Sequence, residues 1–218
     1  MQTDKHTKKP TARDKLLNVA LTILREKGYS ATTVDDLCAA AGVTKGAFFH
    51  YFAGKEDLGV AAARHWSDVT GAMFANADYH RAADPLDRIL GYVALRRSLI
   101  EGAVSEFTCV VGTMVQEMFL DSPAIRDACA DSIYGHAATL EPDFQATIDR
   151  YGDKTSPSAA SLAAHTQTVL QGAFILAKAG NDTQVALDAC DHLDRYIRLL
   201  FPGRRADIKT TGQQETPQ

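Results

Sequence analysis

Apolar side chains recur along this chain with the three- and four-residue spacing of an amphipathic helix. Between residues 11 and 27, Leu17, Ala20, Leu21 and Leu24 lie at i, i+3, i+4 and i+7, which places them on one helical face. No segment shows the period-two alternation or hairpin turn that indicates paired strands. The pattern predicts an all-α fold of about nine helices, at residues 11–27, 34–41, 45–52, from about 55, 85–102, 106–119, 123–150, 157–179 and 183–201.

Capping residues and prolines predict where several helices begin or break. Three dipeptides, Asp84-Pro85, Ser122-Pro123 and Ser156-Pro157, place a capping side chain before a proline, which suits the first helical position. Pro142 lies inside the segment 123–150, so that helix should kink or split near Leu140. Residues 1–10 and 204–218 are polar, and we expect them to be flexible tails.

Residues 32–55 have the features of a helix-turn-helix. Two short helices are joined by a turn containing Gly42, and a three- or four-residue glycine-containing turn is typical of this motif. Its apolar inner face would comprise Val34, Leu37, Cys38, Val43, Phe48 and Phe52. Thr32 or Thr33 stands where a side chain can cap the first short helix, and Thr44 stands where one can cap the second.

The residues left on the outer face of the second short helix suggest a nucleic-acid partner. Lys45 can reach a base edge or a phosphate, and small neighbouring residues let the backbone approach DNA closely. Lys55 opens the next helix, whose amino end can hold an anion. Adjacent exposed aromatic residues on so short a helix are costly without a partner. The outward set comprises Thr44, Lys45, Gly46, Ala47, Phe49, His50 and Tyr51.

Charge is distributed unevenly over the 218 residues. Residues 1–55 carry nine Lys or Arg and five Asp or Glu, a net +4, whereas residues 56–218 carry a net −8. A basic head on an acidic body indicates that the head is the part that meets a polyanion. We expect a flexible tail at 1–10, a DNA-binding domain at 11–55, a helical domain at 56–203, and a tail at 204–218.

The stretch from Ala12 to Leu58 resembles the DNA-binding head of the TetR family of bacterial transcriptional regulators. The resemblance rests on about 47 residues, with Gly28-Tyr29, the run Thr32–Leu37, Ala41–Gly46, Phe48–Phe52 and Lys55–Leu58. It implies phosphate contacts from Thr33, Tyr51 and Lys55, and base-proximal positions at Thr44, Lys45, Gly46 and Ala47. Phe49 stands where the family usually has tyrosine, so packing or sugar contact is expected there.

The resemblance also implies a helical bundle with a ligand cavity and a homodimer built from the last two helices. Stripes of apolar residues on those helices favour a dimer independently, because their alternating four- and three-residue steps resemble the seam of paired helices. Ordinary packing in the core of the bundle is the competing interpretation for each stripe taken alone. Two recognition helices about 34 Å apart can read a palindromic operator. The predicted dimer residues are Leu162, Val169, Leu176, Cys190, Leu193, Ile197 and Leu200.

Candidate effector-binding residues are apolar, aromatic or sulfur-containing, and ordinary core packing is the competing interpretation for each. They are Trp66, Met73, Phe107, Cys109, Met114, Met118 and Phe174. The string around Cys109 also resembles a TetR subgroup in which this cysteine senses electrophiles or oxidants. A redox-sensing regulator is therefore an alternative to a regulator released by a small molecule.

Other functional classes find little support. The four cysteines are scattered without a Cys-x-x-Cys pair, which indicates buried thiols, with no disulfide framework and no metal site. The polar start and the lack of an apolar run of about 18 residues predict a cytoplasmic protein that does not enter a membrane. No catalytic motif is present, so no enzyme and no cofactor is expected. A helical-bundle enzyme or a protein-interaction module remains the alternative from a different class.

Overall fold

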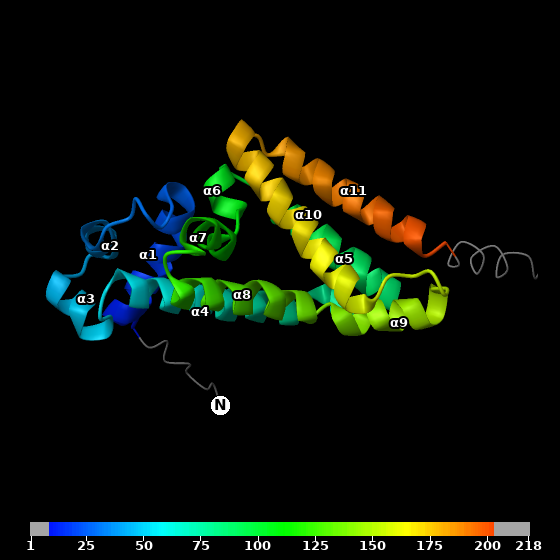
Figure 1. The fold of residues 1–218 in the computed structure, drawn as a ribbon, viewed down its shortest axis with the longest axis horizontal. Coiled ribbons are helices and arrows are strands. Elements are labelled where there is room, and N and C mark those ends of the chain that lie inside the picture. Colours follow the sequence, from blue (N-terminus) through cyan, green and yellow to red (C-terminus); the bar gives the residue numbers. More distant parts are fainter. Residues whose placement is uncertain (1–8, 203–218) are drawn as a thin grey trace, which may run out of the picture. The chain divides into compact units, whose positions relative to one another are not determined.

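A computed structural model describes residues 9–202, which are helical almost throughout (Figure 1). Within that range there are eleven α-helices and one 3-10 turn, and no strand. The predicted all-α fold is therefore confirmed. The elements are α1 (Ala12–Lys27), α2 (Val34–Ala41), α3 (Lys45–Tyr51), α4 (Lys55–Ala75), η1 (Asp78–Arg81), α5 (Pro85–Ser98), α6 (Val104–Phe107), α7 (Val110–Met118), α8 (Pro123–Ala138), α9 (Glu141–Tyr151), α10 (Ala159–Gly180) and α11 (Gln184–Leu200).

The chain divides into two compact units, and each draws on two separate stretches of sequence. Unit 1 comprises the described residues up to Val69 together with 109–132, and unit 2 comprises 70–108 together with residues from 133 onward. The division falls inside α4 and α8, so each of these helices contributes residues to both units. The boundary we expected after residue 55 therefore does not coincide with the observed division.

Unit 1 is built around the amphipathic face of α1. That helix packs against α2, α3 and α7, and the predicted apolar positions Leu17, Ala20, Leu21 and Leu24 are all buried. From the short helices, Leu37 and Phe48 are fully buried. Burial of an apolar side chain of this size stabilises a fold by roughly 1.5–3 kcal/mol, so α1 anchors both short helices.

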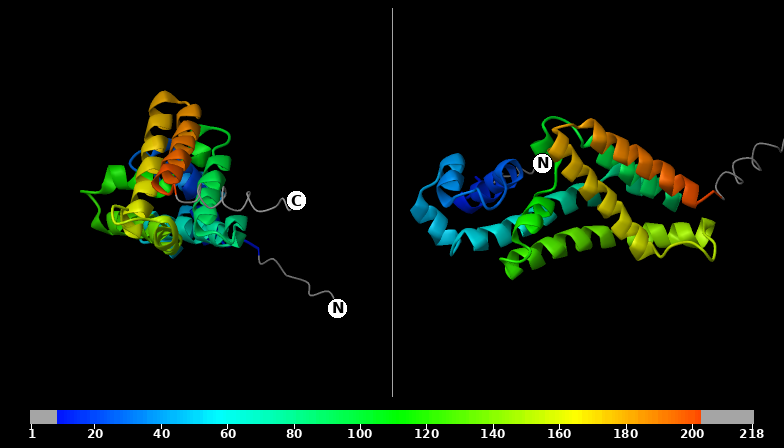
Figure 2. Two further views of the ribbon diagram at one scale, coloured as in Figure 1. Left: turned by 90° about the vertical axis from the view of Figure 1, so that its right-hand side faces the viewer. Right: turned by 45° about the horizontal axis from the view of Figure 1, so that its top comes forward.

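Unit 2 is a bundle in which α5 and α10 are central. The helix α5 packs against η1, α9 and α11, while α10 packs against α6, α9 and α11. Figure 2 shows α10 and α11 running alongside each other in yellow and orange. Apolar side chains of α5, α9, α10 and α11, including Tyr92, Phe144, Leu170 and Ile197, form the buried interior.

Local signals located most helix ends correctly. The carboxylate of Asp84 accepts a hydrogen bond from Leu86 N at 2.8 Å, and Ser122 Oγ accepts one from Ile125 N at 3.2 Å. The segment 123–150 splits into α8 and α9 around Leu140, as Pro142 predicted. The helix start predicted at Ser156-Pro157 was wrong, because α10 begins at Ala159 with Ser158 as its cap.

A second correction concerns the predicted helix at 106–119. It is interrupted at Thr108 and Cys109, which have extended backbone angles, and Cys109 caps the new helix α7. The predicted tail 204–218 and most of the tail 1–10 lie outside the described residues. None of the described helices is long and apolar enough to span a bilayer.

Candidate nucleic-acid interface

Two side-chain caps and one glycine fix the geometry of α2 and α3. Thr33 Oγ1 accepts a hydrogen bond from Asp36 N at 3.1 Å, and the Asp36 carboxylate accepts one from Thr33 N at 2.9 Å. This reciprocal arrangement is a capping box. Gly42 ends α2 with φ of 62°, a left-handed conformation that glycine adopts without steric cost. Thr44 Oγ1 then caps α3 by accepting from Ala47 N at 3.1 Å.

The charged carboxylate of Asp36 also stabilises the start of α2. The backbone hydrogen bond from Thr33 and a hydrogen bond from Lys27 lower the pKa of Asp36 to about 2. Lys27 Nζ lies 3.0 Å from Asp36 Oδ2. A negative charge at a helix amino end is favourable, so α2 keeps a charged cap at neutral pH.

The outward side of α3 is exposed, as the sequence predicted. Phe48 is buried, whereas Phe49 next to it is 57% exposed and Tyr51 is 39% exposed. Phe49 leans against Phe48 edge to face with ring centroids 5.2 Å apart, and the rings of His50 and Tyr51 are 4.8 Å apart. Of the predicted outward residues, Thr44, Lys45, Gly46, Phe49, His50 and Tyr51 are exposed and Ala47 is half-buried.

Gly46 leaves room at the start of α3. A Cβ atom added there would meet only Thr44 Oγ1, at 3.8 Å, which is ordinary van der Waals contact. The packing of the chain itself therefore does not require glycine at this position. A glycine that the fold does not need is consistent with a backbone that a partner approaches closely.

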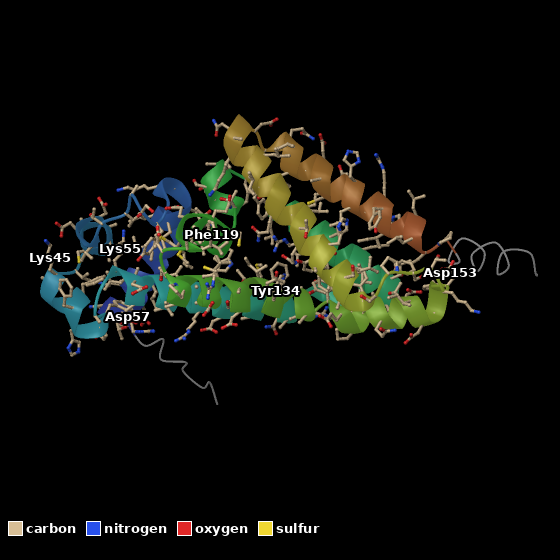
Figure 3. All side chains as sticks on the ribbon, in the orientation of Figure 1. Lys45, Lys55, Asp57, Phe119, Tyr134 and Asp153 are labelled. Carbon is tan, nitrogen blue, oxygen red and sulfur yellow. The ribbon has the colours of Figure 1, made fainter. Side chains whose placement is uncertain are left out.

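The two lysines of the predicted interface have different surroundings (Figure 3). Lys45 Nζ lies 2.7 Å from Asp35 Oδ1 in an ion pair whose members are both more than 60% exposed, and this pairing raises the pKa of Lys45. Exposed pairs of this kind contribute little to stability, so Lys45 can exchange Asp35 for a phosphate at little cost.

Lys55 is instead bound to the loop between α1 and α2. Its ammonium donates hydrogen bonds to the carbonyl oxygens of Tyr29, Ser30 and Thr32 at 3.1, 3.4 and 3.0 Å. It also lies 4.4 Å from the centroid of the Tyr29 ring. A phosphate contact from Lys55 must therefore share an ammonium whose first role in the described structure is to hold this loop.

A second side chain, which the sequence did not reveal, binds the same loop. Glu117, on α7, accepts hydrogen bonds from Tyr29 N at 3.0 Å and Ser30 N at 2.7 Å. The loop is thus held by a cation on its carbonyl groups and an anion on its amide groups. Glu56 forms a further bond within unit 1, to the hydroxyl of Ser122. Sequence periodicity carries no signal for such contacts between distant segments.

The predicted effector residues are divided between the two units. Trp66, Cys109, Met114 and Met118 belong to unit 1, whereas Met73, Phe107 and Phe174 belong to unit 2. Only Phe107 and Phe174 have a described contact with each other, with ring centroids 5.9 Å apart. Trp66 lies under the guanidinium of Arg25 at 5.5 Å, and Met114 is fully buried.

The predicted sensor cysteine is also largely buried. Cys109 Sγ accepts a hydrogen bond from Gly112 N at 3.4 Å. Burial raises the pKa of the thiol of Cys129, which interacts electrostatically with Cys109, to about 12. A thiol held protonated reacts slowly with oxidants and electrophiles, so Cys129 is poorly suited to assist Cys109 in such chemistry.

The structure corrects four of the predicted dimer residues. Leu162, Cys190, Leu193 and Ile197 are each no more than 2% exposed within the single chain, because their helical faces pack into the interior of unit 2. Val169 and Leu200 are half-buried, and Leu176 is exposed. The large apolar residues of α10 and α11 that do face solvent are Ile175, Leu176, Tyr196 and Leu199.

A polar cluster in unit 2 was not anticipated from the sequence. Tyr92 Oη lies 2.9 Å from His136 Nε2 and accepts a hydrogen bond from Gln167 Nε2 at 3.0 Å. Burial, together with the positive charge of Arg96, lowers the pKa of His136 to about 4. The sequence signal for this cluster was the i, i+4 spacing of Tyr92 and Arg96 on α5. Such spacing occurs equally on helix faces that only contact solvent, so it does not identify a binding site.

Comparisons with known proteins converge on one family. The model of the bacterial regulatory proteins of the tetR family matches residues 16–62. The transcriptional regulator AcuR of Cereibacter sphaeroides is 32% identical over 107 residues, and the match spans about half of each chain, 49%. The HTH-type transcriptional repressor AcnR of Corynebacterium glutamicum is 26% identical over 195 residues, which cover 87% of this chain and 95% of AcnR.

Solved structures share the fold over most of the chain. Regulatory protein TetR from Rhodobacter sphaeroides superposes with a TM-score of 0.71 at 24% identity, covering 84% of this chain and 97% of that one. A TetR-family regulator from Agrobacterium tumefaciens gives 0.74 at 18% identity, covering 85% and 96%. Residues 16–62 therefore match the DNA-binding head of the tetR family of bacterial regulatory proteins, and the chain shares its fold with solved structures of that family.

Proposed function

We propose that this protein is a cytoplasmic transcriptional regulator that binds a palindromic DNA operator as a homodimer and is released by a small molecule, acting as a repressor. The observation that carries the DNA-binding role is the outward side of α3. It presents Phe49 and Tyr51 to solvent beside Lys45 and an unconstrained Gly46. A short helix capped by a threonine side chain, with exposed aromatic and basic residues on its outer side, suits a recognition helix in the major groove.

The homodimer is proposed on the solvent-facing side of α10 and α11. Ile175, Leu176 and Leu199 are exposed there, and the ring of Tyr196 stacks against His165 on the neighbouring helix at 5.1 Å. A Cβ atom added at Gly172 would meet no atom of the chain within 4 Å. Small residues of this kind let two helices approach closely, and an exposed apolar face is typical of an interface.

Effector binding is proposed in unit 2, with α4 as the element that transmits it. The helix α4 begins at Lys55, which holds the α1–α2 loop, and its last residues belong to unit 2. A ligand that prefers a different arrangement of α4 would shift the population toward a form that fits the operator poorly. A coupling of roughly 1–3 kcal/mol would lower operator affinity about 5- to 150-fold.

Fluorescence anisotropy with duplex DNA tests the DNA-binding role. The purified chain is titrated with an operator selected from a random duplex library, at two salt concentrations. Affinity should fall steeply as salt rises, because phosphate contacts release counterions. Lys45→Ala should weaken specific binding, whereas Lys154→Ala, which removes the same charge from an exposed site in unit 2, should not. If the library yields no selected sequence at low salt, the protein is not a DNA-binding regulator.

A further inference from the structure

Among residues 9–202, the side chain of Arg96 in unit 2 has no acidic partner. It projects from α5 and is half-buried, and none of the residues 9–202 accepts a hydrogen bond from it or forms an ion pair with it. Its neighbour Arg97 differs in this respect. Arg97 Nε lies 2.7 Å from Asp191 Oδ1, and its Nη2 lies 3.3 Å from Asp191 Oδ2. Within residues 9–202, Arg97 thus has a carboxylate partner and Arg96 does not.

Aromatic rings surround the guanidinium of Arg96. Its central carbon lies 5.4 Å from the ring centroid of Phe74 and 5.7 Å from that of Phe174. Phe107 extends this apolar wall beyond Phe174. A cation over two rings gains some stabilisation, but five N–H donors in a partly desolvated place call for an acceptor.

Neutral polar groups adjoin the same place. The ring of His136 lies 4.6 Å from that of Phe74 and holds Tyr92 through a 2.9 Å hydrogen bond. Only Nε2 of His136 has a hydrogen-bond partner among the described residues. Because His136 has a pKa of about 4, it is uncharged near neutral pH. Arg96 therefore supplies a single positive charge, flanked by neutral hydrogen-bonding groups and aromatic walls.

We propose that Arg96 is the anchor of the effector site and that the effector is a small monocarboxylic acid with an apolar body. The planar guanidinium suits a carboxylate, which can accept two parallel hydrogen bonds from it. One cation without a second basic group matches a monoanion better than a phosphate dianion. The rings of Phe74, Phe107 and Phe174 would contact the apolar body. This inference rests on the proposed function, because it names the ligand of the proposed effector domain.

Isothermal titration of the full-length protein tests the site directly. The probes are benzoate, phenylacetate and hexanoate, each compared with its own amide, which keeps the shape and removes the charge. At least one acid should bind about ten- to hundredfold more tightly than its amide, as expected for charge-assisted hydrogen bonds. If none of the three acids is preferred over its amide, the proposal is overturned.

Variants of the two arginines assign the preference to one residue. Arg96→Met keeps the apolar stem between the rings and should abolish the preference for acid over amide. Arg97→Met removes the same charge one residue away and should retain it. Arg96→Lys keeps the charge without the fork and should lose part of the preference, which provides a folded comparison if Arg96→Met proves unstable by circular dichroism. Retention of the full preference in both Arg96 variants would overturn the proposal.

Operator binding, measured separately, distinguishes this proposal from the proposed function. If DNA binds specifically but no acid is preferred, the effector class is wrong and the regulator remains. If an acid binds through Arg96 and no duplex is selected, the site stands and the proposed regulatory function fails. If both hold, the preferred acid should weaken operator binding in wild type and in Arg97→Met, and not in Arg96→Met.

Discussion

Replacement of Glu117 by alanine removes the anion that holds the loop between α1 and α2. Its two carboxylate oxygens accept hydrogen bonds from Tyr29 N and Ser30 N, and hydrogen bonds to charged groups contribute roughly 1.5–3 kcal/mol each. Glu117 is half-buried, and water can replace part of the loss. We therefore expect Glu117→Ala to lower the free energy of unfolding by about 2–3 kcal/mol, and Glu117→Gln, which keeps one acceptor, by about 1 kcal/mol.

Chemical denaturation followed by circular dichroism measures this effect. The midpoint should fall while the denaturant slope stays constant, since the surface exposed on unfolding is unchanged. Glu26→Ala is the matched control, because Glu26 is exposed on α1 and no described contact involves it. A midpoint for Glu117→Ala that equals that of Glu26→Ala would refute the reasoning, because the loop would then be held by Lys55 and local packing alone.

Three further outcomes follow from the structure. Gly46→Ala should leave the free energy of unfolding unchanged or raise it by up to about 1 kcal/mol, because the added Cβ fits. It should nevertheless weaken operator binding in anisotropy measurements, and an unaltered affinity would show that Gly46 is not part of the interface. Leu199→Arg should give a monomer of normal helicity in sedimentation, because Leu199 is 71% exposed on α11, whereas Leu120→Arg, at a site 77% exposed in unit 1, should remain a dimer. Between pH 6.5 and 4, His136 binds a proton in the unfolded chain but not in the folded one. The free energy of unfolding should therefore fall by up to about 3 kcal/mol as the pH drops through this range. The urea midpoint of His136→Gln should fall less steeply with pH than that of the wild type.

Features determined by neighbouring residues could be predicted from the sequence. Thr33, Gly42 and Thr44 each make hydrogen bonds to residues only three or four positions away, so the helix-turn-helix and its exposed side followed from spacing. The start of α10 illustrates the limit even at short range. Ser156 and Ser158 both stand beside Pro157, and Ser156 Oγ instead accepts a hydrogen bond from Asp153 N at 2.9 Å, which leaves the capping role to Ser158.

Contacts between distant segments could not be predicted in this way. The apolar stripe on α11 was predicted to be a dimer seam, because periodicity identifies an apolar face without showing what covers it. Cys190, Leu193 and Ile197 are covered by the chain's own helices, so the interface is proposed one face away, at Tyr196 and Leu199. The pairing of Lys55 and Glu117 with the same loop depends on residues up to 88 positions apart, for which a single sequence carries no signal.

Both ends of the proposed mechanism involve α4. Lys55 at its first position holds carbonyl groups of the α1–α2 loop, and Phe74 near its last position lies under the Arg96 guanidinium. A carboxylate that draws Arg96 away from Phe74 therefore changes the packing of the same helix whose first residue positions the head. Because binding free energies are linked, an effector that weakens operator binding by a given factor must itself bind the DNA complex more weakly by that factor. Loss of Arg96 should remove this linkage without altering DNA affinity in the absence of ligand, whereas loss of Lys55 should alter that affinity and leave ligand binding intact.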